Sequence, residues 1–223
     1  MDLLLTPELQ IKAAGQTVEV TLKAQWNGSP GQQFSAVDAI LSWDPAHLQF
    51  TGFDTSTAGY PWFIADFLND PDGINASLAD GNGLFTALAN PGSPATAPAA
   101  PGSITIARFH FQTLSGTAST AVQLLPTFGV FGRTRVLGPT AGSDITGNIA
   151  SMANVTIVAP CSPTVGDVNG DMFITFADIS SAVDVYLGFD TTPAHIVAAD
   201  ANCDGFANGL DIQPLVNYIL LWL

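Results

Sequence analysis

The sequence predicts a mainly β protein, in which an antiparallel, jelly-roll-like β-sandwich is followed by a small α-helical module. Its 21 Gly and 15 Pro residues separate short apolar runs, which favours many strands joined by turns over long helices. Several of these runs alternate apolar and polar side chains, as a strand with one buried face does. After residue 166 the alternation gives way to two aspartate-rich loops, each followed by an apolar pattern of helical period.

Strand patterns recur from the N-terminus to residue 158. Alternation is strict in Val18–Lys23 and again in Ile104–Phe111, which indicates half-buried strands. The aromatic segment 60–68 is expected to form a helical turn or a wide loop, and the Pro-rich segment 88–103 an internal loop. The expected strands lie within residues 3–24, with a turn at 13–16, and then at 34–43, 48–53, 104–111, 121–125, 129–135 and 153–158.

A short Pro-containing segment at residues 159–163 marks the predicted domain boundary. We expect a sandwich at 1–159 and a separate module at 160–223. The only two cysteines, Cys161 and Cys203, both fall in the second part. A zinc site would need more ligands than lie nearby, so a disulfide in an oxidising compartment is the favoured interpretation.

The charge balance narrows the range of partners. The chain has 19 acidic and five basic residues, a net charge of -14, and no cluster of Lys and Arg to bind a phosphate backbone or an acidic membrane surface. No run of about eighteen apolar residues is present to span a bilayer. The first residues lack a secretory signal, so an extracellular or cell-surface location implies a leader that has been removed.

Two twelve-residue loops of similar composition start 33 residues apart, at 167 and at 200. Each carries oxygen-bearing side chains at positions 1, 3, 5, 9 and 12, the spacing of an EF-hand-like calcium loop. Ca²⁺ takes about six to eight hard oxygen ligands, and alternate residues of a tight loop supply them together with the position-7 carbonyl. The predicted ligands of two Ca²⁺ ions are Asp167, Asn169, Asp171, the Phe173 carbonyl, Thr175 and Asp178, and Asp200, Asn202, Asp204, the Phe206 carbonyl, Asn208 and Asp211.

Both loops depart from the common EF-hand pattern. Position 12 is Asp where the longer Glu is usual, and position 6 of the first loop is Met172 where glycine makes the sharp turn. A side chain there is expected to be held at an unfavourable positive φ. We therefore expect the first site to bind calcium more weakly than the second.

Each loop leads into a predicted helix, at Ile179–Leu187 and at Ile212–Leu220. Pro214 fits the first turn of the second helix, where its missing N–H costs little. The residues expected on the buried faces are Ile179, Val183, Tyr186 and Leu187 in the first helix, and Leu215 and Ile219 with Tyr218 or Trp222 in the second.

Residues 166–223 resemble a type I dockerin module. The resemblance is carried by Gly166–Asp171 with Asp178, by Asp200–Gly205 with Asp211, and by the absence of an entering helix before each loop. It implies docking to another protein, with loop positions 10 and 11 helping to choose the partner. These positions are Phe176 and Ala177 in the first loop, and Gly209 and Leu210 in the second.

Residues 3–158 resemble a cohesin, the module that dockerins bind. The resemblance rests on Val18–Leu22, on Ala36–Phe50 with its Trp-Asp-Pro segment, and on Ile104–Phe111. It places Asp38 on the face that would meet a dockerin. A chain with both halves can join head to tail with another copy of itself, which gives open chains or closed rings.

The expected function is non-catalytic assembly with another protein. No paired catalytic carboxylates, G-x-S-x-G or H-E-x-x-H motif is present, and the three histidines are scattered along the chain. The alternative is a carbohydrate-binding sandwich carried on a dockerin-like anchor. It would use Tyr60, Trp62 and Phe63, helped by Trp26, as a stacking platform for a polysaccharide.

Overall fold

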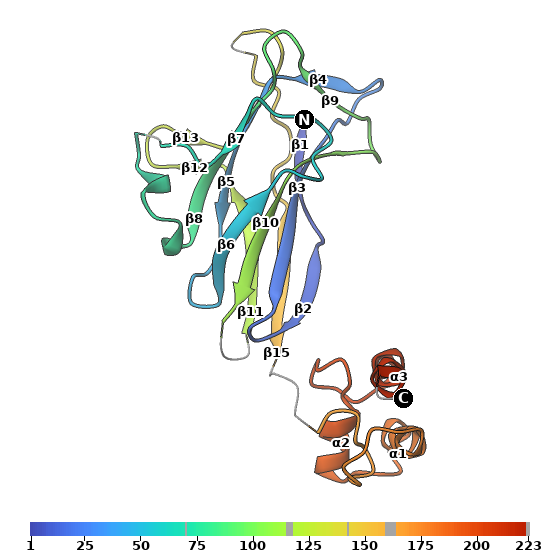
Figure 1. The fold of residues 1–223 in the computed structure, drawn as a ribbon. Coiled ribbons are helices and arrows are strands. Elements are labelled where there is room, and N and C mark those ends of the chain that lie inside the picture. The colour runs from blue at the N-terminus through green and yellow to red at the C-terminus, as the bar shows by residue number, and fades with distance from the viewer. Residues whose placement is uncertain (70, 115–117, 142, 159–163, 222–223) are drawn as a thin grey trace. The chain divides into compact units, whose positions relative to one another are not determined.

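The computed structural model describes residues 1–69, 71–114, 118–141, 143–158 and 164–221 (Figure 1). Its contacts divide the chain into two compact units. The first consists of Met1–Gln10 and Gly15–Thr156, and the second of Ile11–Ala14 and Ile157–Leu223. The predicted boundary between residues 159 and 160 lies outside the described residues and stays a prediction.

The first unit contains two sheets, which form the predicted β-sandwich. The strands are mostly antiparallel, but the N-terminal segment runs parallel to residues 148–154, since the N–H of Leu3 donates to Asn148 and the carbonyl of Glu8 accepts from Asn154. One has the strand order β1-β3-β10-β6 and the other β2-β15-β11-β5-β8-β7, with β14 also paired to β5. The strands of the first sheet are β1 (Asp2–Thr6), β3 (Thr17–Gln25), β10 (Ile104–Thr113) and β6 (Leu48–Asp54). Those of the second are β2 (Leu9–Ala13), β15 (Met152–Val158), β11 (Ala118–Leu125), β5 (Ala36–Ser42), β8 (Asn82–Leu88), β7 (Ile64–Asp66) and β14 (Arg135–Leu137).

Smaller elements decorate the sandwich. Two small two-stranded sheets pair β4 (Gln32–Phe34) with β9 (Ala95–Ala97), and, as a hairpin, β12 (Thr127–Phe128) with β13 (Gly132–Arg133). The Pro-rich segment 88–103 is thus an internal excursion that folds back through β9. Two 3-10 turns, Ile74–Ala76 and Leu78–Asp80, precede β8.

Two expectations for the sandwich are wrong in detail. The aromatic segment 60–68 contains β7, which pairs with β8, and is neither a helical turn nor a loop throughout. Residues 129–135 do not form one strand, because Gly129 has φ 60° and turns the chain between β12 and β13.

The core of the sandwich is an aromatic cluster that joins the two sheets. Phe85 of β8 meets Phe109 of β10 edge to face at a centroid distance of 5.1 Å, and Phe53 of β6 at 5.3 Å. Phe67, which follows β7, packs on Phe85 at 5.4 Å. Edge-to-face aromatic pairs add about 0.5–1.5 kcal/mol each beyond their buried area. These contacts fix how the two layers stack.

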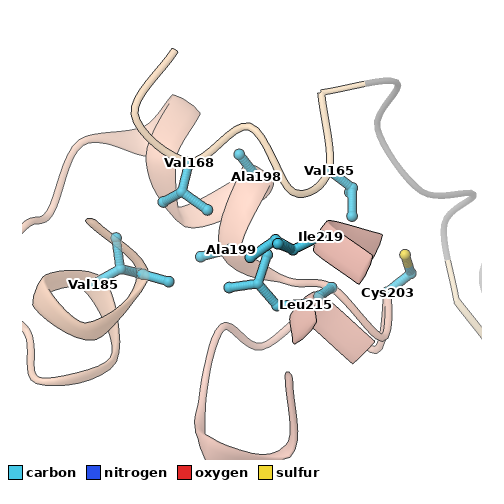
Figure 2. Close-up of a cluster of buried hydrophobic side chains, with 10 residues drawn as sticks. Val165, Val168, Val185, Ala198, Ala199, Cys203, Leu215 and Ile219 are labelled. Atoms are coloured by element: carbon cyan, nitrogen blue, oxygen red, sulfur yellow. The ribbon is translucent and has the colours of Figure 1, made fainter. Parts of the chain in front are cut away.

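The second unit contains three helices around its own small core. They are α1 (Ala177–Tyr186), α2 (Pro193–Ala199) and α3 (Ile212–Leu221), the last preceded by a 3-10 turn at Gly209–Asp211. Figure 2 shows side chains from both halves of the unit converging, with Val168 and Val185 facing Leu215 and Ile219. None of the helices in the described part of the chain is long and apolar enough to cross a membrane.

The predicted helices after the two loops are confirmed, but the predicted buried face of the first is partly wrong. Val183 and Leu187 are 45% and 62% exposed, whereas Ala182 and Val185 are buried. The reason is α2, which packs against α1. The expectation that no helix enters either loop is wrong for the second loop, because α2 ends at Ala199, directly before Asp200. Trp222 lies outside the described residues.

Candidate metal centre

The two acidic loops have the same hydrogen-bond pattern. The position-12 carboxylates, Asp178 and Asp211, are fully buried. Asp178 accepts from the backbone N–H groups of Asn169 (3.1 Å) and Thr175 (2.8 Å), at positions 3 and 9 of its loop. Asp211 accepts from the corresponding N–H groups of the second loop, 2.9 and 2.8 Å away. Each terminal carboxylate therefore ties the middle of its loop to the start of the following helix.

The carboxylates at position 1 close the other side of each loop. Asp167 accepts from the N–H of Met172 at 2.9 Å, and Asp200 from the N–H of Gly205 at 2.8 Å. The side chains at positions 3 and 5 each accept from an N–H two residues further on, at 2.8–2.9 Å, in both loops. The local chain geometry thus gathers the predicted ligand residues of each loop around one turn of backbone.

The residues present fit a divalent cation. Asp167 Oδ1 is buried and has no hydrogen-bond partner, as expected of an oxygen reserved for a metal. Burial raises the pKa of Asp211, and the nearby Asp200 and Asp204 carboxylates raise it further, so negative charge is unfavourable in this loop without a cation. Bound calcium would relieve that repulsion.

Neither loop relies on acidic side chains alone. Within the described residues, no group of three or more His, Cys, Asp or Glu side chains is close enough to hold a metal ion by itself. A calcium loop does not need one, because amide, hydroxyl and backbone carbonyl oxygens complete its ligand set. Asn169, Thr175, Asn202 and Asn208 are the side chains that would supply such oxygens here.

The backbone is left-handed at positions 4 and 6 of both loops. In the first loop these are Gly170 (φ 74°) and Met172 (φ 71°), so the positive φ expected at Met172 is confirmed. In the second they are Cys203 (φ 62°) and Gly205 (φ 90°). Each loop therefore holds one glycine and one strained residue, and backbone strain no longer distinguishes a weaker first site.

Replacing Met172 with glycine is expected to strengthen calcium binding by the first loop. A non-glycine residue in the left-handed region costs about 1–2 kcal/mol, so M172G should tighten that site by about tenfold. Isothermal titration calorimetry of the full chain would measure both sites. The matched control is G205M, which places the same side chain at position 6 of the second loop and should weaken that site alone. Unchanged affinity in both variants would contradict the strain argument.

Cys203 is buried and disulfide-bonded. Its predicted partner, Cys161, lies outside the described residues, so the pairing of the two stays a prediction. At position 4 of the second loop, Cys203 also stands between the predicted ligands Asn202 and Asp204. A disulfide here restrains one of the two left-handed residues of that loop.

Tyr186 of the first repeat contacts the residue directly before the second loop. Its hydroxyl donates to the carbonyl of Ala199 at 2.9 Å, next to the first ligand of that loop. Burial, reinforced by Asp211 and Asp200, raises the pKa of Tyr186 to about 12. Helix α1, which follows the first loop, therefore packs against the start of the second loop.

The predicted partner-binding residues of the module are accessible. Phe176, Ala177, Gly209 and Leu210 are all exposed, at the starts of α1 and of the 3-10 turn before α3. Asp38, which the resemblance placed on the docking face, already has partners within the sandwich, and its role in docking stays a prediction. Its side chain is only 15% exposed, pairs with Arg135 Nε at 2.8 Å and accepts from the Thr86 hydroxyl at 2.8 Å.

The residues proposed as a sugar platform lie mainly in packing contacts. Trp62 packs on Phe34 at 5.8 Å and donates to the carbonyl of Ile106 at 3.0 Å. Tyr60 packs on Trp62, donates to the Ser93 carbonyl and accepts from the Asn90 N–H. Of these three residues only Phe63 is largely exposed, and sugar binding stays a prediction.

The comparisons with known proteins give different relatives for the two units. The model of the dockerin type I domain matches residues 165–220. No curated protein matches the chain. The seventh ScaB type I cohesin from Pseudobacteroides cellulosolvens is 13% identical with a TM-score of 0.50, over 73% of this chain and 94% of that one.

Two further solved structures are similar at lower scores. CaCohA2 from Clostridium acetobutylicum is 14% identical with a TM-score of 0.49, over 73% of this chain and 92% of that one. A non-cellulosomal cohesin from the hyperthermophilic archaeon Archaeoglobus fulgidus is 12% identical with a TM-score of 0.47, over 71% and 91%. At such identities the likeness to the first cohesin concerns the fold alone. The chain therefore carries a dockerin type I domain at residues 165–220, preceded by a β-sandwich with the cohesin fold.

Proposed function

We propose that this chain is a non-catalytic, extracellular assembly protein whose C-terminal module is organised by two Ca²⁺ ions and docks on another protein. The observation that carries the proposal is the pair of loops with one hydrogen-bond pattern, inside the segment that matches the dockerin type I domain. The buried, disulfide-bonded Cys203 supports an oxidising location.

Calcium has a structural role in this proposal. Asp167, Asn169, Asp171, Thr175 and Asp178 would hold one ion with the Phe173 carbonyl, and their counterparts from Asp200 to Asp211 the other. The ions supply positive charge to a segment, 161–223, that contains eight Asp and no Lys, Arg or Glu. The loops then fix where α1 and α3 begin, and these helices carry the docking residues.

The docking surface is apolar and occurs twice. Phe173 and Phe206, at position 7 of the two loops, are both exposed, as are Leu187 and Leu220 at the equivalent ends of α1 and α3. Large exposed apolar side chains gathered on so small a unit indicate a protein interface. Because the loops around it are polar, this apolar surface is expected to supply most of the free energy of docking.

A second copy of the chain is the proposed partner. The chain carries both a dockerin module and a sandwich of cohesin fold, so each copy offers one half of a pair. Contact between unlike surfaces of identical chains is heterologous, and it generates rings or open chains. Association should therefore depend on concentration and on calcium.

Light scattering coupled to size exclusion tests this proposal on the full chain. In excess calcium the mass is expected to rise above that of one 23.1 kDa chain as concentration increases, and to return to it in EDTA. The control is D178N/D211N, which removes one charge from each loop and should remain monomeric in calcium. A monomer in both conditions would refute self-association, while a mass unaffected by EDTA would refute the role of calcium.

A further inference from the structure

Each calcium loop contains one asparagine that is followed directly by glycine. The chain has four such pairs, which begin at Asn27, Asn82, Asn169 and Asn208. The last two are predicted calcium ligands, at position 3 of the first loop and position 9 of the second. An asparagine before glycine is chemically labile, because glycine has no Cβ to keep its backbone nitrogen away from the asparagine side chain. Two of the labile residues are therefore residues on which calcium binding depends.

Such a pair reacts with the loss of ammonia. The backbone nitrogen of the glycine bonds to Cγ of the asparagine, the Cγ–Nδ2 bond breaks, and Nδ2 leaves as ammonia with the proton of the glycine N–H. Water then opens the resulting cyclic imide. Opening at Cγ leaves aspartate, whereas opening at the backbone carbonyl carbon leaves isoaspartate, whose main chain runs through the side chain and is one carbon longer. An isoaspartate in a calcium loop would shift the ligands on either side of it out of their common spacing.

The folded first loop holds Asn169 away from this reaction. Its Oδ1 accepts from the N–H of Asp171 at 2.9 Å, and its Nδ2 donates to Oδ2 of the same residue at 3.0 Å. Its own backbone N–H donates to Asp178 at 3.1 Å. For Cγ to reach the nitrogen of Gly170, the side chain must leave these partners, which requires the loop to open.

Asn208 of the second loop is held in the same manner. Its Oδ1 accepts from the N–H of Leu210 at 2.9 Å, and its Nδ2 donates to the carbonyl of Phe206 at 2.9 Å. Its backbone N–H donates to Asp211 at 2.8 Å. All the partners of Asn169 and Asn208 lie within their own loops, so both asparagines are released when the loops lose their folded geometry.

The two pairs of the sandwich are held by contacts that involve no calcium loop. Asn82 lies in β8, directly opposite Ser42 of β5. Asn27 donates from Nδ2 to Asp2 of β1 at 2.5 Å. Because neither belongs to a predicted metal site, the rates at which they react should not depend on calcium.

We propose that Asn169 and Asn208 are sites of ammonia loss that bound calcium protects, so that a chain left without calcium is permanently damaged in both loops. The protection rests on the calcium binding proposed above, because an ion that binds only the folded loops keeps them closed. The damage is irreversible, since ammonia is lost and isoaspartate does not revert to asparagine. The lifetime of the module is then set by how long it stays without calcium.

Incubation of the full chain at mildly alkaline pH, in calcium or in EDTA, tests the proposal. Protease digestion and mass spectrometry would follow the conversion of each asparagine to aspartate or isoaspartate. At a hundredfold excess of calcium over its Kd only about one loop in a hundred is empty, so Asn169 and Asn208 should react about a hundredfold more slowly than in EDTA. Asn27 and Asn82 should react at the same rate in both conditions. After calcium is restored, calorimetry should find fewer filled sites, in proportion to the isoaspartate formed.

The variant G209A checks the chemistry at one site. A Cβ at Gly209 meets no atom within 4 Å, and the residue has no positive φ, so the fold should be retained. In EDTA Asn208 should then react several-fold more slowly than in the wild type, while Asn169 of the same chain reacts as before. Intact Asn169 and Asn208 after prolonged incubation in EDTA would overturn their assignment as reactive sites. Equal rates in calcium and EDTA, with calorimetry showing both loops filled, would overturn the protection, whereas a chain that binds no calcium would refute the proposed function on which it rests.

Discussion

Chelating calcium is expected to unfold residues 164–221 while the sandwich stays folded. An ion that binds only the folded state at a thousandfold excess over its Kd contributes about 4 kcal/mol, so two ions contribute about 8 kcal/mol. That is comparable to the whole stability of a typical domain, about 5–15 kcal/mol. Without calcium, little besides the small core around Leu215 and Ile219 opposes the repulsion among the eight Asp residues.

Differential scanning calorimetry of the full chain would show this result. Two transitions are expected in calcium, and the one that belongs to the module should disappear in EDTA. The sandwich transition is the internal control, because all the predicted calcium ligands lie within residues 167–211, in the other unit. A module transition that persists unchanged in EDTA would show that calcium is not required for folding.

Replacing Phe85 with alanine is expected to destabilise the sandwich by about 3–5 kcal/mol, the usual cost of removing a buried aromatic side chain. Phe85 is fully buried and contacts three other Phe rings from both sheets, so the substitution opens a cavity between the layers. Urea unfolding followed by tryptophan fluorescence would measure the loss.

The matched control for Phe85 is F63A. Phe63 is 61% exposed, so its replacement should change the free energy of unfolding by no more than about 0.5 kcal/mol. The module transition should be unaffected in both variants. Similar losses in F85A and F63A would show that the aromatic cluster does not hold the two sheets together.

The calcium loops could be predicted from the sequence because their geometry is local. Twelve consecutive residues contain all the ligands of one ion, so the spacing of Asp and Asn predicts which residues supply the oxygens. The strain at Met172 followed from the same reasoning. The left-handed Cys203 was missed, although comparing position 4 of the two loops, Gly170 against Cys203, would have revealed it.

Features that depend on distant parts of the chain could not be predicted in this way. Arg135 meets Asp38 only because β14 pairs with β5 in one register, 97 residues away in sequence. The buried face of α1 was misassigned because its position depends on α2, a helix of seven residues that is too short to show a helical period in the sequence. In both cases the contacts of a side chain depend on a residue or helix that tertiary packing places beside it.

The contact between Tyr186 and Ala199 makes the duplicated module indivisible. A helix from the first half closes on the backbone of the second, and the core in Figure 2 draws side chains from both. Neither repeat has a complete interior without the other. The duplicated module is therefore one folding unit, and a chain cut between the repeats would retain the sequence of a calcium loop but not the scaffold that shapes it.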